Sequence, residues 1–80
     1  MTHDDIGEQV RRIVAEHFRR PLAEVVPEAN FVQDFDADSL DIVILLDAIE
    51  RDLDVRVPDE EVERLRTVQD AMNWVGARLR

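Results

Sequence analysis

The chain contains no cysteine, only two glycines and three prolines among its 80 residues, and no long apolar run. Without cysteine it forms no disulfide and offers no thiolate for chemistry, which favours a reducing compartment. So few turn-forming residues argue against many short strands and favour a few helices joined by loops. A membrane span needs about 20 predominantly apolar residues, so we expect none. The polar N-terminal segment also lacks the pattern of a secretory signal, so we expect a cytoplasmic protein.

Basic residues are scarce relative to acids, 10 against 19, and the formal net charge is −9 at pH 7. Nucleic acid would be repelled, so we expect no nucleic-acid partner. A protein partner with a basic patch would be attracted, and the encounter would depend on salt. Solubility alone would also account for this charge. Disorder is disfavoured because 45% of the residues are hydrophobic and are regularly spaced.

The first half of the chain predicts one long helix and one long connection. Apolar residues recur every three or four positions from about residue 4 to 18, a helical pattern that Pro21 ends. The connection over residues 21–38 is too apolar for a loose linker. We therefore expect an ordered loop packed on the core, with a short turn at residues 22–25.

A second helix is predicted from about Ser39 to Leu53, because Asp38 or Ser39 can cap its first turn and apolar residues then recur at helical spacing. This helix is apolar around much of its circumference, with Ile42 and Ile44 towards the other side. Its predicted core stripe consists of Val43, Leu46, Ile49 and Leu53, with Leu45 beside it.

Two further helices are predicted in the C-terminal part. Pro58 followed by three acids predicts a short third helix to about Leu65. Thr67 and Asp70 resemble a capping box that opens a fourth helix over residues 68–79. No internal repeat is evident, so we expect a single domain over residues 1–80. The predicted fold class is all-α: a four-helix bundle with a short third helix and a long loop between helices 1 and 2.

The candidate functional residue is Ser39, which lies at a junction between loop and helix with acids around it. The two histidines, His3 and His17, both lie in or before the first helix, so no base is next to Ser39 in sequence. A serine nucleophile needs a base and an oxyanion site, and a chain this small offers no obvious cleft for them. We therefore expect no enzyme activity and interpret Ser39 as an exposed attachment point, although a helix cap is the commonest role of such a serine.

The stretch from Phe31 to Asp41, with Asp38-Ser39-Leu40 within it, resembles the phosphopantetheine attachment motif of acyl carrier proteins. The segments 57–61 and 67–71 resemble the starts of the third and fourth helices in that family. The resemblance covers nearly the whole chain and is greatest to the carriers of bacterial type II fatty-acid synthesis. It implies that a phosphopantetheinyl transferase attaches 4'-phosphopantetheine to Ser39, with Asp38 placing the serine and the transferase's metal, and Leu40 completing the motif.

The thiol of that arm would carry acyl groups as thioesters, in fatty-acid biosynthesis or a related pathway. The resemblance also implies that the helices shelter the acyl chain, because each buried methylene gains about 0.8 kcal/mol. A ring as bulky as Trp74 near the end of the pocket would shorten or redirect it. The implied pocket lining is Phe31, Val43, Leu45, Leu46, Ile49, Val57, Val62, Leu65, Ala71 and Trp74.

In this family partners bind the second helix, so the resemblance implies a monomer recognised by acyl-transfer and chain-elongation enzymes with basic docking patches. The implied contact residues are Asp41, Ile44, Asp47, Glu50 and Arg51. Ile44 stands where an acid is common, Asp47 where an apolar residue is common, and Arg51 replaces an expected acid. These departures are explained either by neutral drift on a solvated face or by a dedicated set of partners.

Two further departures lie in loops, where Arg19 and Asp36 each replace a glycine, so we expect the local backbone to differ there.

Two alternative functions are retained. One is a specialised carrier for polyketide, aminoacyl or lipid-modification chemistry. The other is a calcium-binding or interaction module without the arm, since Asp34, Asp36 and Asp38 alternate as at the start of an EF-hand loop. That pattern then fails, because Ser39 stands where glycine is needed and Leu45 where the bidentate glutamate is needed. We therefore expect no resident metal.

Overall fold

The computed structural model describes residues 3–79, and their side chains from Ile6 onward. Within this range the chain forms five α-helices and one 3-10 turn, with an isolated antiparallel bridge between Asn30 and Thr67 in place of any strand. The elements are α1 (His3–Phe18), η1 (Leu22–Glu24), α2 (Phe31–Phe35), α3 (Ser39–Leu53), α4 (Asp59–Val62) and α5 (Val68–Arg78). No helix of the described chain is both long and apolar enough to cross a membrane.

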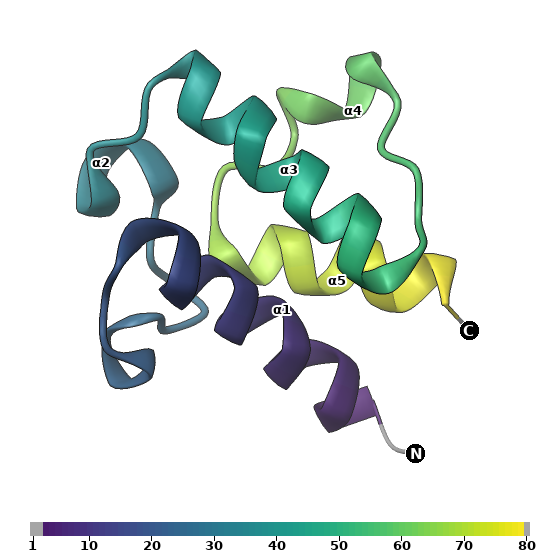
Figure 1. The fold of residues 1–80 in the computed structure, drawn as a ribbon, viewed down its shortest axis with the longest axis horizontal. Helices are drawn as coiled ribbons and strands as arrows, with labels where there is room; N and C mark the ends of the chain where they lie inside the picture. Colours follow the sequence, from purple (N-terminus) through teal and green to yellow (C-terminus); the bar gives the residue numbers. More distant parts are fainter. Residues whose placement is uncertain (1–2, 80) are drawn as a thin grey trace.

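The three long helices α1, α3 and α5 enclose the core, and α3 lies between α1 and α4 in the view of Figure 1. Each long helix buries one apolar stripe, as its spacing predicts. The largest side chains with almost no exposure are Phe31, Leu45, Ile49, Val10, Val14, Val25, Val68 and Val75. The all-α class is confirmed.

The buried face of α3 differs from the predicted stripe at one position. Leu45, Leu46 and Ile49 are buried, whereas Val43 is 54% exposed. With 3.6 residues per turn, Val43 is rotated by roughly 110° from the centre of the face that those three residues define. The prediction that Val43 lies in the core was therefore wrong, because a helix that is apolar on several sides does not reveal which side packs.

The long connection between α1 and α3 is more ordered than the sequence predicted. The short turn expected at residues 22–25 is present as η1. Residues 31–35, predicted as loop, form the helix α2, whose first-turn amides at Val32 and Gln33 donate to the side chain of Asn30 at 2.9 and 3.0 Å. This local cap stabilises a helix too short for apolar periodicity to reveal.

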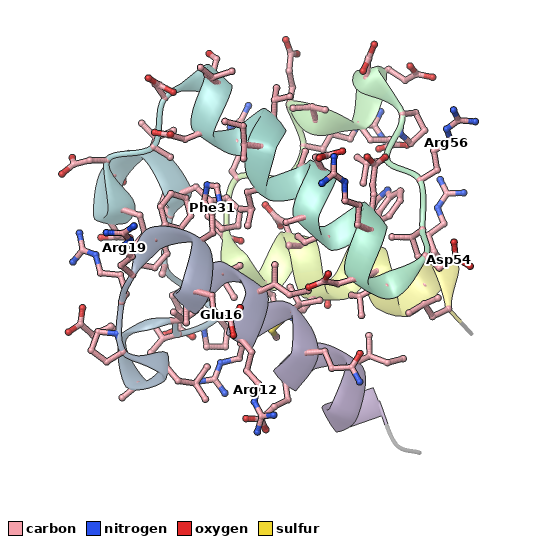
Figure 2. The ribbon with its side chains drawn as sticks, viewed as in Figure 1. Arg12, Glu16, Arg19, Phe31, Asp54 and Arg56 are labelled. Atoms are coloured by element: carbon pink, nitrogen blue, oxygen red, sulfur yellow. The ribbon has the colours of Figure 1, made fainter. Side chains whose placement is uncertain are left out.

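Aromatic contacts fix α2 against the end of α1. The ring of Phe18 stacks with those of Phe31 and Phe35, at centroid distances of 6.3 and 5.1 Å. Figure 2 shows Phe31 inside the molecule, whereas Arg12 and Arg19 project outward from it. Because α2 leads directly into residues 36–38, this packing positions the start of α3.

The helices of the C-terminal part begin where the sequence predicted, but α4 is shorter. It ends at Val62 rather than near Leu65, although Leu65 is still buried. The predicted capping box of α5 is confirmed: the amide of Asp70 donates to Thr67 Oγ1 at 3.1 Å, and the amide of Thr67 donates to Asp70 Oδ2 at 3.2 Å.

The backbone accommodates Arg19 and Asp36 without leaving the conformation that glycine favours. Both residues adopt the left-handed region with φ of 55°, as does Asp54 with φ of 54°. This conformation costs a non-glycine residue about 1–2 kcal/mol, and less for aspartate, whose side chain hydrogen-bonds locally. Arg19 and Asp36 therefore carry backbone strain that a glycine at the same position would avoid.

Candidate functional site

The candidate site is the N-terminal end of α3, where a capping box fixes the backbone around Ser39. The amide of Asp41 donates to Asp38 Oδ1 at 2.9 Å, and the amide of Asp38 donates to Asp41 Oδ2 at 3.2 Å. Asp38 is therefore the cap, and Ser39 is the first helical residue. Of the two caps that the sequence allowed, the structure selects Asp38 and leaves the hydroxyl of Ser39 uncommitted to capping.

The residues on both sides of Ser39 differ in burial. Ala37 is 4% exposed and anchors the chain as it approaches the helix, whereas Asp38, Ser39 and Leu40 are all exposed. The serine therefore sits on a fixed backbone with its side chain open to solvent, which is what a modifying enzyme needs in order to reach the hydroxyl. It is also the only serine in the sequence.

The local structure fits a phosphodiester on Ser39. The amides of the first helical residues have no acceptor within the helix, and the N-terminal end of the helix dipole is positive. Because the capping box uses the amide of Asp41, the amides of Ser39 and Leu40 are the ones that an attached phosphate would meet. The carboxylates of Asp38 and Asp41 oppose a phosphate there, and each already accepts one backbone amide.

The acids that resembled a calcium loop are used differently. The carboxylate of Asp34 accepts the amide of Asn30 at 2.6 Å at the start of α2, while Asp38 caps α3. Among the residues whose side chains are described, no group of three or more histidines, cysteines or acids lies close enough to hold a metal ion. Two of the three alternating acids, Asp34 and Asp38, thus accept backbone amides in local helix caps.

An exposed surface on α3 continues from Ser39. We define the outer face of α3 as Leu40, Val43, Ile44, Asp47 and Arg51. Three of these are exposed apolar side chains: Leu40 at 65%, Val43 at 54% and Ile44 at 48%. Asp47 and Arg51, one turn apart, form an exposed ion pair at 3.0 Å. Because each charge of this pair neutralises the other, the outer face is less acidic than the rest of the chain.

The two other predicted contact residues have carboxylates engaged within the chain. Asp41 belongs to the capping box of α3. Glu50 is partly buried, and its Oε2 accepts the amide of Val57 at 2.7 Å. The hydrogen bond between Glu50 and Val57 could not be predicted from the sequence, because its donor is a backbone amide in the loop after α3 and no pattern of side chains indicates it.

A surface pocket of about 260 Å³ lies between α3 and α4, beside the outer face. Its lining consists of Val43, Ile44, Leu46, Asp47, Glu50, Val57, Asp59 and Val62. Four residues of the predicted pocket lining, namely Val43, Leu46, Val57 and Val62, are therefore brought together here. The other four lining residues had not been assigned to a pocket.

The remaining predicted lining residues lie deeper or farther away. Phe31, Leu45, Ile49, Leu65 and Ala71 are buried in the core. Trp74 packs partly buried against that core, and the guanidinium carbon of Arg78 lies 4.8 Å from the centroid of its ring. A larger open groove of about 760 Å³ between α1 and α5 contains none of the predicted site residues.

Comparisons with known proteins identify the family. A family model described as "Phosphopantetheine attachment site" matches residues 8–75. The chain is also 45% identical over 76 residues to the "Acyl carrier protein" of Thermosynechococcus vestitus (strain NIES-2133 / IAM M-273 / BP-1), covering 95% of this chain and 94% of that protein. The chain belongs to the acyl carrier protein family. The resemblance on which the sequence interpretation relied is thus confirmed.

Family membership settles the class of function. The carrier is not an enzyme, and its cofactor is the phosphopantetheine group whose attachment site the family model describes. The exposed Ser39 at the start of α3 lies within the matched residues.

Proposed function

We propose that this chain is a discrete carrier of acyl intermediates, held as thioesters on a 4'-phosphopantetheine arm attached to Ser39, for fatty-acid biosynthesis or a related pathway. The observation that supports this most strongly is the exposed Ser39 at the first position of α3, held there by the Asp38–Asp41 capping box. When bound, the arm supplies a terminal thiol that a cysteine-free chain does not have. Residues 1–80 act as one carrier domain in this proposal.

In this proposal the carrier positions Ser39, and the phosphopantetheinyl transferase catalyses the attachment of the arm. Asp38 fixes the backbone of Ser39 through the capping box and, as an exposed carboxylate, also helps to position the transferase's metal. Leu40 is 65% exposed beside the serine and offers the transferase an apolar contact. The Oγ atom of Ser39 would form a bond to the phosphorus that carries the arm in coenzyme A, the bond from that phosphorus to the nucleotide would break, and adenosine 3',5'-bisphosphate would leave. The proton of the hydroxyl would pass to a base of the transferase.

Intact-mass measurement after incubation with coenzyme A and a broad-specificity transferase tests the proposal. We expect the wild type to gain the mass of one arm. Ser39→Ala removes the only serine of the chain and should gain nothing. Absence of any gain by the wild type with several transferases would contradict the assignment, as would a gain by the variant.

We further propose that the outer face of α3 binds acyl-transfer and chain-elongation enzymes through an apolar centre surrounded by acids. Support comes from the exposed Leu40, Val43 and Ile44, and from the net charge of −9, which attracts a basic docking patch. Since Arg51 already neutralises Asp47, apolar contact should contribute more than charge at this face. This favours a dedicated set of partners over neutral drift.

Loading by a general fatty-acid synthase tests the choice of partner. The double variant Ile44→Glu with Asp47→Met restores an acid at 44 and an apolar residue at 47. We expect the wild type to be a poor substrate and the double variant to be a better one. A wild type that is already a good substrate, with no gain in the double variant, would contradict a dedicated partner set.

The pocket between α3 and α4 is the proposed shelter for the acyl chain, because it adjoins the outer face near Ser39 and is lined by Val43, Leu46, Val57 and Val62. A chain that extends inward from it would have to displace core side chains such as Ile49. We propose that Trp74 limits the length that is sheltered, so Trp74→Ala should protect a longer acyl thioester from cleavage than the wild type does.

A specialised carrier for polyketide, aminoacyl or lipid-modification chemistry is the second candidate, favoured by the unusual outer face. It shares the arm and Ser39 with the first candidate and differs in cargo. The mass of the group carried by protein purified from its own cell separates the two.

A further inference from the structure

The loop between α3 and α4 is held at three points by a single residue of α3. The main-chain oxygen of Glu50 accepts the amide of Asp54, which ends the helix, and the amide of Val55 at 3.2 Å. Its side-chain Oε2 accepts the amide of Val57 at 2.7 Å. The bond from the Val57 amide to the Glu50 carboxylate is charge-assisted and partly buried. Charge-assisted hydrogen bonds are stronger than bonds between neutral groups.

This contact lies at the pocket that is proposed to shelter the acyl chain. Glu50 and Val57 both line the pocket, one from α3 and the other from the loop that leads into α4. Their hydrogen bond therefore joins the two walls directly. It also places the side chain of Val57, which is 9% exposed, against the core.

The helix α4 depends on this loop for its position. It has four residues, none of them buried, and its N-cap Pro58 makes no side-chain capping bond. A helix this short is not stable by itself and takes its position from the segments that flank it. Of those segments, the one before α4 is fixed by Glu50, and the one after it by the buried Leu65.

We propose that Glu50 is a positioning residue that holds the α4 wall of the pocket against α3, and so sets how firmly an acyl chain is enclosed. The proposal rests on the proposed function, since it assumes that cargo enters this pocket. It differs from the role of a docking acid, because the property that matters is a hydrogen-bond acceptor and not a negative charge.

Three variants separate the two roles. Glu50→Ala removes both acceptor and charge, and Glu50→Gln keeps an acceptor oxygen of the same reach without the charge. Asp52→Ala removes one exposed carboxylate from the same helix and serves as the matched control. All three are compared with the wild type at a temperature where circular dichroism shows each to be folded.

The first measurement is hydrogen exchange at the Val57 amide in protein without the arm, followed by NMR. We expect exchange to be faster by on the order of tenfold or more in Glu50→Ala, because a bond to a charged acceptor is lost. Glu50→Gln should exchange at a rate between those of the wild type and Glu50→Ala, since a neutral bond of roughly half the strength replaces the charged one. Asp52→Ala should match the wild type. Equal exchange in wild type and Glu50→Ala, or equal exchange in the two Glu50 variants, would overturn the proposal.

The second measurement uses arm-bearing protein loaded with octanoyl or acetyl groups, and follows cleavage of the thioester by hydroxylamine. An acetyl group is too short to reach far into the pocket, so its cleavage should be the same in all four proteins. Octanoyl cleavage should be slower than acetyl cleavage in the wild type, Asp52→Ala and Glu50→Gln. In Glu50→Ala it should approach the acetyl rate.

The outcomes distinguish this inference from the function on which it rests. If Ser39 takes up no arm, the proposed function fails, while the exchange experiment still decides whether Glu50 holds Val57. If the arm is attached but octanoyl is cleaved as fast as acetyl in the wild type, the role of Glu50 in enclosing cargo is refuted. The same holds if octanoyl cleavage in Glu50→Ala matches that in Glu50→Gln.

Discussion

The cap of α3 offers the sharpest single test of how this carrier presents Ser39. Asp38→Ala removes the carboxylate that accepts the amide of Asp41 at 2.9 Å, and it disrupts the reciprocal arrangement that holds the amide of Asp38. Loss of such a cap costs about 1 kcal/mol, within a range of about 0.5–2. In a domain of this size, 1 kcal/mol lowers the melting temperature by roughly 4–8 °C.

Asp38→Asn separates the cap from the charge. Asparagine caps about as well as aspartate, so Asp38→Asn should change the free energy of unfolding by no more than about a few tenths of a kcal/mol. Its melting temperature should therefore stay close to that of the wild type. If the carboxylate also positions the metal of the transferase, loading of Ser39 should nevertheless be much slower in this variant. The assays are thermal unfolding by circular dichroism and the initial rate of arm attachment by mass spectrometry.

Two results would refute this reasoning in different ways. A melting temperature of Asp38→Ala equal to that of the wild type would show that the capping box contributes nothing to α3. Normal loading of Asp38→Asn would show that Asp38 acts only through the backbone, with no role toward the metal.

Two further predictions concern the fold. Arg19 has a left-handed backbone, so Arg19→Gly should raise the free energy of unfolding by about 0.5–1 kcal/mol, which is the backbone strain relieved minus the entropy cost of glycine. Arg19→Ala keeps the strain and should show no such gain in a denaturant titration. An equal gain in both variants would contradict the explanation. Ile49 is 1% exposed, so Ile49→Ala should lower the free energy of unfolding by about 2–5 kcal/mol. The exposed Val43 should tolerate alanine within about 0.5–1 kcal/mol, and similar losses at the two positions would mean that the buried face of α3 is wrongly assigned.

The sequence predicted α3 and its cap well because two independent signals agree there. The apolar spacing requires a helix, and Asp38 with Ser39 marks its first residue, so the predicted bounds of 39–53 match the structure. The start of α5 was predictable for the same reason, since Thr67 and Asp70 form a local capping box. Signals that lie within four residues of one another can be recognised without coordinates.

Features that depend on distant contacts could not be predicted in the same way. Helix α2 is shorter than the length over which a period can be counted, and the stacking of Phe31 and Phe35 on Phe18 accompanies its packing on α1. The exposure of Val43 depends on which side of α3 packs against the core, and apolar residues lie on several sides of that helix. The bond between Glu50 and Val57 joins a side chain to a backbone amide seven residues away, so no pattern of side chains indicates it.

The identity of the modified residue is the central claim, and it is tested most directly on protein purified from its own cell. Tandem mass spectrometry of the peptide that contains residues 34–41 should find a phosphopantetheine group on Ser39. A peptide from these cells that is always unmodified, or an arm located on the hydroxyl of Thr67, would contradict the account.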